Sequence, residues 1–220
     1  MKKLYVFFAM AAMAAVLLSG CMVGGRNVVR GEGPRVAHEL NVTGFTSLAI
    51  NGAHELIFRH GDYSAVLEIQ ANLFEFLNAE VVNGVLHIRY SRAFTTIGRD
   101  VTPRLIIYAP NLYWLDVLGA VTGRVYVDAT AFDVSVSGAA NLTLRGTAER
   151  LVITAAGAAK IDAFNLEAQH VTVSVAGAAY IDVYAVQTLD ASVSGVGTVR
   201  YDGDATVTRR VSGIGSISRR

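Results

Sequence analysis

Alternating apolar and polar residues dominate the second half of the chain. Phe132, Val134 and Val136 alternate with polar side chains before Gly138, and the same period of two precedes Gly177. Such alternation predicts β-strands with one buried face. Each of these strands ends at a glycine, and a second alternating strand follows a few residues later. The pattern therefore repeats one unit, which consists of a strand, a glycine corner and another strand.

The repeated unit returns every 18 to 20 residues. A period of this size is typical of a solenoid, in which each repeat forms one coil and buries its apolar residues only by stacking on its neighbours. We therefore predict an all-β fold, a single-stranded parallel β-helix with coils of about 18–20 residues and right-handed connections. The predicted structural corners are an outlying copy at Gly52, an irregular copy at Gly119, and Gly138, Gly157, Gly177, Gly195 and Gly213.

The residues two positions after the corner glycines are small, as at Ala140 and Ala159. Both these residues and the corner glycines share the parity of the buried strand residues. We therefore predict that they point inward and are small because the two strands of a corner converge there and leave no room for larger side chains. His54 occupies this position in the outlying copy and indicates an irregular turn. Residues of the opposite parity, mostly serine, threonine and asparagine, are predicted to form solvent-facing columns.

The first half of the chain is less regular. Its strongest local signal is Asn83-Gly84, which lies between two apolar alternating segments and predicts a β-hairpin, because both turn residues readily adopt positive φ. We therefore expect one β-helical domain over residues 37–220, with irregular strands and one hairpin over 37–112 and regular coils over 113–220.

The N-terminus carries the pattern of a secretory leader. Lys2 and Lys3 precede an apolar run over residues 4–18, and Leu18-Ser19-Gly20-Cys21 resembles a bacterial lipobox. We predict a lipoprotein signal peptide over 1–20, acylation of Cys21, and a flexible tether over 21–36 that is rich in glycine and arginine. One alternative is a leader that is cleaved nearby and leaves the Cys21 thiol unmodified. The other is an uncleaved N-terminal segment that anchors the chain in the membrane.

Charge and cysteine content limit the possible partners. The chain has 19 Lys and Arg against 18 Asp and Glu, without a basic cluster, which argues against a nucleic-acid partner. Cys21 is the single cysteine, so no intramolecular disulfide is possible. Met22 stands where aspartate often marks lipoproteins kept at the inner membrane, and this favours the outer membrane.

One column of the predicted β-helix offers candidate chemistry. Asp162, Asp182 and Arg200 each lie five residues after a corner glycine and should stack on successive coils. Two neighbouring carboxylates would bind calcium or act as acid and base, if their separation is suitable. The alternative is a solvent-facing ladder in which Arg200 offsets the repulsion. Tyr180 offers an aromatic surface for a sugar or a protein, and the histidines match no metal-binding spacing.

Several motifs together resemble the bacterial head GIN domain family. They are Val42-x-Gly44-Phe45-x-x-Leu48-x-Ile50-x-Gly52, Leu86-x-Ile88 after the Asn-Gly turn, Ala109-Pro110-Asn111-Leu112, and the serial glycine corners. The family is named for the heads of autotransporter adhesins. The resemblance implies a secreted or lipid-anchored β-helix without an established activity, and it supplies no catalytic residue, metal or cofactor.

The expected function is that of a non-catalytic interaction module of the bacterial envelope, an adhesin or an organiser of the envelope. Its expected partners are a lipid bilayer, through acylated Cys21, and an envelope glycan or protein. The first alternative is a carbohydrate-binding or polysaccharide-degrading protein that uses the Asp162/Asp182 face. The second is a purely structural spacer.

Overall fold

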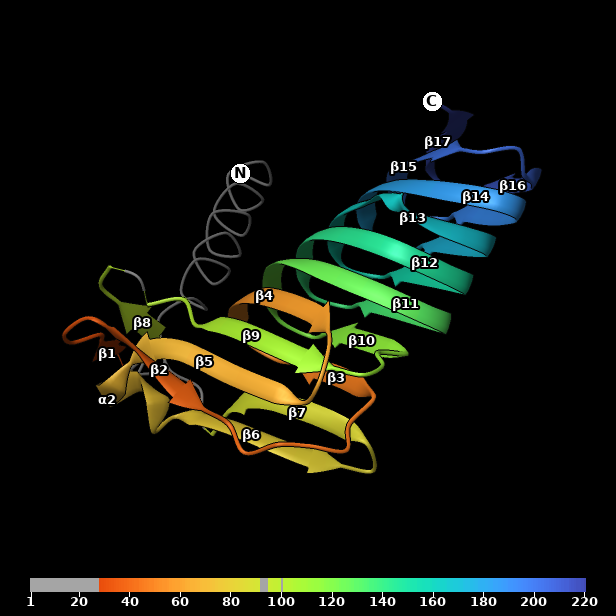
Figure 1. Cartoon of the computed structure of the whole chain (residues 1–220). Helices are drawn as coiled ribbons and strands as arrows, with labels where there is room; N and C mark the ends of the chain where they lie inside the picture. Colours follow the sequence, from red (N-terminus) through yellow and green to blue (C-terminus); the bar gives the residue numbers. More distant parts are fainter. Residues whose placement is uncertain (1–27, 92–94, 100) are drawn as a thin grey trace, which may run out of the picture.

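A computed structural model of the chain describes residues 28–91, 95–99 and 101–220 (Figure 1). The predicted signal peptide and Cys21 lie outside the described residues. Nearly all described elements are strands, and the short helix α2 (Ala71–Phe74) is the exception. The strands are β1 (Val28–Arg30), β2 (Arg35–Glu39), β3 (Ser47–Ile50), β4 (Ala53–His60), β5 (Ser64–Gln70), β6 (Leu77–Val82), β7 (Val85–Tyr90), β8 (Thr95–Ile97), β9 (Arg104–Ala109), β10 (Trp114–Val117), β11 (Ala120–Val136), β12 (Ala139–Ala155), β13 (Ala158–Val175), β14 (Ala178–Val193), β15 (Val196–Asp202), β16 (Thr206–Val211) and β17 (Ile214–Arg219).

The regular coils stack in parallel. β11 pairs with β12, β12 with β13 and β13 with β14, and each pair matches one repeat with the next. The register joins Ala120 to Ala139, Ala139 to Ala158 and Ala158 to Ala178. Figure 1 shows these strands as successive rungs that rise toward the C-terminus. The predicted parallel β-helix is confirmed.

The core lies inside the coils. The segment before each corner and the segment after it belong to two opposed faces, and their apolar side chains meet between them. Val134 and Ile153 come from the first face, Leu142 and Ile161 come from the second, and each is at most 1% exposed. Ala140 and Ala159 are 8% and 7% exposed, so they point inward as predicted.

The corner glycines are required for a different reason from the one predicted. A Cβ at Gly157 would overlap the carbonyl oxygen of Gly138 and lie 2.6 Å from that of Ser137, both on the preceding coil. The obstacle is therefore the backbone of the neighbouring coil and not the converging strands of the same corner. Backbone atoms cannot move aside without shifting the ladder, so only glycine fits this close approach.

The first half of the chain extends the same core but stacks out of sequence order. β3 pairs with β7 on one side and β10 on the other, while β4 pairs with β9 and β11. The coil formed by β3 and β4 thus lies between the later strands β7 and β9 and the regular coils. β6 and β7 form the predicted hairpin, with φ of 52° at Asn83 and 77° at Gly84. β5 pairs antiparallel with β9 and β2.

The first described strands lie within or next to the predicted tether. Val28–Arg30 forms β1 and pairs in parallel with β8. Asn72 on α2 adds to this anchoring, because its side-chain amide donates to the carbonyl of Arg30 at 2.7 Å. None of the helices in the described segments is long and apolar enough to cross a membrane.

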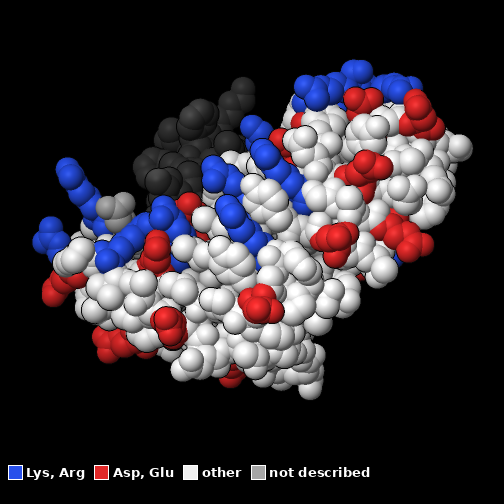
Figure 2. All heavy atoms as spheres, in the orientation of Figure 1, with Lys and Arg blue, Asp and Glu red and all other residues white. Residues whose placement is uncertain are grey.

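Charged side chains are unevenly spread over the surface. Figure 2 shows lysine and arginine gathered at the end of the β-helix that the last coil forms. β16 and β17 supply Arg209, Arg210 and Arg219, and Arg220 follows β17. Several of them are paired, as in the bridge of 2.7 Å between Arg210 and Asp190 and that of 3.1 Å between Arg219 and Asp204.

Candidate functional site

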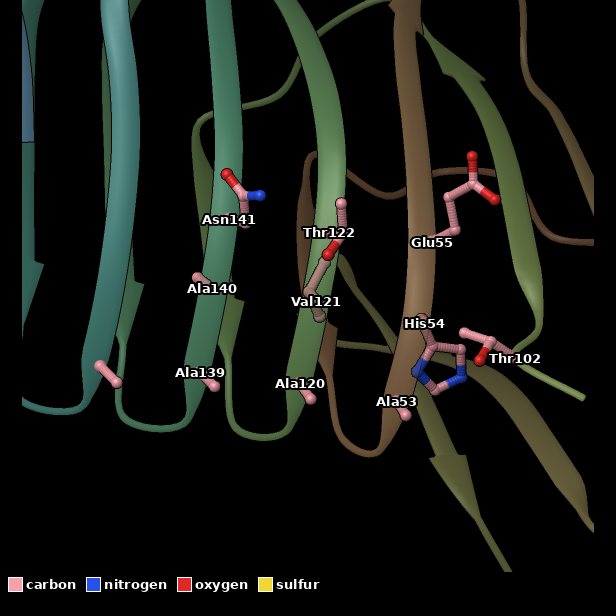
Figure 3. Close-up of a pocket in the computed structure, with 11 residues that line it drawn as sticks. Ala53, His54, Glu55, Thr102, Ala120, Val121, Thr122, Ala139, Ala140 and Asn141 are labelled. Carbon is pink, nitrogen blue, oxygen red and sulfur yellow. The ribbon is translucent and has the colours of Figure 1, made fainter. Parts of the chain in front are cut away.

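An open groove runs across the first coils of the β-helix, beside their corners (Figure 3). Its volume of about 550 Å³ lies within the range of small-molecule sites. Four alanines from successive coils line it in a row, each directly after a corner: Ala53, Ala120, Ala139 and Ala158. We call it the alanine groove. All four are exposed. Their position follows from strand alternation, which turns every second residue outward.

A second row of side chains borders the alanines. Glu55, Thr122 and Asn141 lie two residues further along their strands and therefore face the same side of the sheet (Figure 3). The parallel register places Glu55 beside Thr122, and Thr122 beside Asn141. The groove thus combines a methyl-lined floor with uncharged hydrogen-bonding groups and one carboxylate.

The carboxylate of Glu55 is already engaged. Nε of Arg104 donates to its Oε2 at 2.9 Å, and Nη1 of the same guanidinium donates to Glu68 at 3.2 Å. The hydrogen bond to Glu55 is the main cause that raises the pKa of Arg104. Because Arg104 carries one positive charge against the two carboxylates, the cluster keeps one net negative charge beside the groove.

His54 lies at one end of the groove, between Ala53 and Thr102 (Figure 3). Its side chain is 1% exposed, and both ring nitrogens are closed to solvent. The ring of Tyr90 stacks on it at a centroid distance of 5.6 Å. Burial lowers the pKa of His54 from 6.5 to about 4, and a hydrogen bond with the backbone of Gly52 opposes this only in part. The imidazole is therefore neutral at physiological pH, with one donor and one acceptor nitrogen.

The spacing of the corners predicts an inward position for His54 and indicates no binding role for it. A polar side chain at a position that is alanine or glycine in most other coils was the available signal. Its neighbours Thr102 and Tyr90 come from distant parts of the chain, so local sequence does not show them.

The candidate column of Asp162, Asp182 and Arg200 is stacked as the spacing predicts. Asp182 is 6% exposed, and both of its oxygens accept hydrogen bonds from Arg200 at 2.8 Å. Asp162 accepts a hydrogen bond from the backbone of Phe164 at 3.2 Å. This geometry favours a ladder in which Arg200 offsets the repulsion over a calcium or acid–base site, because both oxygens of Asp182 already accept from Arg200. Asp182 does not face solvent as predicted, since it is nearly buried.

Aromatic rings surround the same arginine. The guanidinium of Arg200 lies 4.9 Å from the ring centroid of Tyr180 and 5.7 Å from that of Phe164. Arg220 approaches the same Phe164 ring at 4.6 Å. These cation–π contacts cover a face of Tyr180 that was predicted to be free for sugar or protein.

Metal ligands do not gather in the described part of the chain. No group of three or more His, Cys, Asp and Glu side chains lies close enough there to hold a metal ion. A further open groove of about 470 Å³ lies along another edge of the coils, where it is lined by Asp128, Glu149 and Gln169 among others.

Comparison with known proteins identifies the family. Residues 44–205 match the family described as putative auto-transporter adhesin, head GIN domain. A crystal structure of a putative adhesin from Bacteroides fragilis is similar, with a TM-score of 0.68 and 18% identity, over 87% of this chain and 100% of the other. A putative lipid binding protein from Parabacteroides distasonis has a TM-score of 0.50 and 19% identity, over 88% and 100%. No curated protein matches. At these identities the two structures show a shared fold, whereas the match to the family covers most of the chain, which therefore belongs to the head GIN domain family.

Proposed function

We propose that this protein is a non-catalytic interaction module, held on the outer membrane by lipid on Cys21 and binding an envelope partner along the alanine groove. The observation that carries the proposal is the groove itself, an open surface built from aligned side chains of successive coils. Its lining is mostly methyl groups, hydroxyls and an amide, which suit binding rather than bond cleavage. The adhesin description of the family supports the same role.

The lipid anchor rests on the N-terminal pattern. Cys21 is the single cysteine and follows Leu18-Ser19-Gly20 at the end of an apolar leader. Two or three acyl chains hold a protein stably on a bilayer, whereas one chain binds only marginally. With β1 starting at Val28, only a short segment separates Cys21 from the folded domain, so the domain lies close to the membrane surface.

The anchor is tested by cell fractionation. We expect wild-type protein in the outer membrane and Cys21→Ser in the soluble fraction. Met22→Asp should move the protein to the inner membrane, and Met22→Ala serves as its matched control. Membrane retention of Cys21→Ser would show that acylation does not hold the protein.

The interaction role is tested by protease treatment of intact and lysed cells. An adhesin exposed at the surface is degraded in intact cells, whereas a module that organises the envelope from the periplasm is degraded only after lysis. Failure of purified protein to associate with intact cells or with isolated envelope fractions would leave only the structural spacer.

The carbohydrate-binding alternative on the Asp162/Asp182 face has less support, because Arg200 occupies both oxygens of Asp182. It predicts that the double change Asp162→Asn and Asp182→Asn removes glycan binding. If the partner instead binds in the alanine groove, the same variant should still bind it.

A further inference from the structure

Three arginines from neighbouring coils lie together on the face that follows the corners. Arg59 on β4, Arg124 on β11 and Arg145 on β12 are all exposed. Tyr126 lies between them, because the ladder pairs it with Arg145 and the guanidinium of Arg59 lies 5.5 Å from its ring centroid. Arg124 precedes Tyr126 by two residues on the same strand and thus faces the same side. We call the three arginines around Tyr126 the arginine cluster, and Figure 2 shows basic side chains gathered across the middle of this face.

The sequence alone does not show this cluster. Arg59 and Arg124 are far apart along the chain and become neighbours only because β4 stacks on β11 out of sequence order. Basic residues that are scattered in the sequence are therefore gathered in the fold.

None of the three arginines has a carboxylate partner among the described residues. Ion pairs with described Asp or Glu side chains involve six other arginines: Arg89, Arg104, Arg150, Arg200, Arg210 and Arg219. In the row of Arg124 the neighbouring coils carry Ile57 and Thr143, so stacking of the coils does not itself require a cation there. An anion would therefore gain attraction from all three guanidinium groups and relieve their mutual repulsion.

Carboxylates border the arginine cluster. Glu55, Asp128 and Asp162 lie on the same strands or on the next coil, and each already accepts a hydrogen bond from another described residue. A membrane surface, or another broad anionic surface, that covered the cluster would meet these carboxylates as well and be repelled by them. A narrow chain that follows the row of Arg59, Tyr126 and Arg145 would contact the arginines without covering the carboxylates. The geometry therefore favours a narrow anionic ligand.

The stacking of the coils also sets the spacing of the charges. Arg59 and Arg145 are two coils apart, roughly 10 Å, and Arg124 belongs to the coil between them. A peptide that binds by strand addition needs an open sheet edge, whereas β4, β11 and β12 each have ladder partners on both sides. A chain of uronic acids needs no such edge. It carries one carboxylate on each sugar ring, so that its successive rings present anions to successive coils.

Uncharged hydrogen-bonding groups lie directly beside Arg124. A small groove of about 170 Å³ is lined by Arg124 together with Thr122, Asn141 and Thr143, among others. Glu55, Thr122 and Asn141 also line the alanine groove, so the two grooves adjoin. Hydroxyl and amide groups next to a guanidinium suit an acidic sugar, which carries hydroxyls beside its carboxylate.

We propose that the arginine cluster binds an acidic polysaccharide of uronic acid units, whose carboxylates pair with Arg59, Arg124 and Arg145. Each guanidinium donates two parallel hydrogen bonds to one carboxylate. The sugar hydroxyls bind the polar lining of the small groove beside Arg124. This inference rests on the proposed interaction role of the protein. It extends the binding surface from the alanine groove to the neighbouring arginines and names the chemical class of the partner.

The test titrates tetragalacturonic acid, an oligosaccharide with one carboxylate on each ring, into the detergent-solubilised full chain by isothermal calorimetry. Arg124→Gln should raise Kd about threefold to tenfold, and the combined change of Arg59, Arg124 and Arg145 to Gln should abolish detectable binding. Arg124→Lys keeps the charge but loses the planar fork, so its Kd should lie between those of Arg124→Gln and wild type. Arg150→Gln removes the charge of an exposed arginine that is paired with Asp133 outside the cluster, and it should leave Kd unchanged.

Three outcomes would overturn the inference. They are the absence of tetragalacturonic acid binding, equal affinity for its methyl ester, which keeps the rings but lacks the charges, and equal Kd values for Arg124→Gln and Arg150→Gln. If the chain instead binds vesicles that contain phosphatidylglycerol and the triple variant does not, the cluster recognises a membrane surface and the polysaccharide is wrong. Each outcome leaves the proposed anchoring and envelope role intact, because fractionation and protease accessibility are measured without any sugar.

Discussion

The first coil, formed by β3 and β4, differs from the regular coils in how its corner is held. At Gly138 and Gly157 the preceding coil's carbonyl groups leave no space for a Cβ, although φ at both residues lies outside the positive region. Gly52 instead has φ of 108°, and a Cβ there would lie 2.7 Å from Cδ2 of Tyr90. Regular corners are thus specified by contact between backbones, and the first corner by conformation and side chains.

The largest effect is expected at a regular corner. Gly157→Ala should lower the free energy of unfolding by about 3 kcal/mol or more, because the new Cβ overlaps the backbone of the preceding coil. Urea denaturation measures the loss. Ala156→Ser, a change at the exposed neighbouring residue, is the control and should have little effect. A loss below about 1 kcal/mol for Gly157→Ala would mean that the corners can relax and that their backbones are not closely packed.

The first coil should show a pH dependence that the regular coils lack. The pKa of His54 is about 4 in the folded chain, and its usual value is 6.5. Well above pH 6.5 the imidazole is neutral in the folded and the unfolded chain, so it causes no loss of stability. As pH falls from 6.5 to about 4, the unfolded chain binds a proton that the folded chain does not, so stability decreases by roughly 3 kcal/mol.

This pH dependence is measured as the difference between wild type and His54→Phe, because carboxylates also titrate toward the lower end of the range. Glu55 lines the same groove, and Tyr90, whose pKa burial raises to about 12, stays neutral throughout. His60→Asn, a change at an exposed histidine, should keep the wild-type slope. Identical slopes for wild type and His54→Phe would contradict the neutral buried ring.

Removing one partner of an ion pair should lower Tm in both regions, with a smaller difference between the regions than the changes above. Asp182 lies in the regular coils and is nearly buried against Arg200, whereas Glu68 pairs with Arg104 in the first half with 30% of its side chain exposed. Asp182→Asn should lower Tm by several degrees, since it leaves Arg200 without its bidentate partner. Glu68→Gln should change Tm by no more than about 3 °C. Equal changes would show that burial of Asp182 adds nothing.

The regular coils and the first half of the chain also differ in how much of their strand pairing the sequence predicts. Alternation around Gly138 and Gly157 predicts the stacked coils, because each coil repeats the same local pattern and pairs with its neighbour. The hairpin at Asn83-Gly84 is predictable for a similar reason, since its strands are adjacent in sequence. The insertion of β9 between β4 and β5 is not, because strand pairing over a long separation leaves no local signal.

The candidate site shows the same limit. Parity places the exposed alanines after each corner and His54 inside, but only the fold brings Thr102 and Tyr90 to the imidazole. Similarly, spacing stacks Asp162 on Asp182, but the burial of Asp182 depends on how Arg200 and its aromatic neighbours pack. Contacts between coils follow from the repeat, whereas contacts with inserted segments do not.

The smallest effect is expected at the hairpin of the first half, where glycine is needed for conformation alone. Gly84 has φ of 77°, and no described atom lies within 4 Å of a Cβ built there. Gly84→Ala should therefore cost about 1 kcal/mol from backbone strain, without any clash. Gly84→Asn should cost less, because asparagine tolerates this region better than alanine. Urea denaturation of both variants beside Gly157→Ala separates the two requirements for glycine, and a loss at Gly84 as large as that at Gly157 would contradict the distinction.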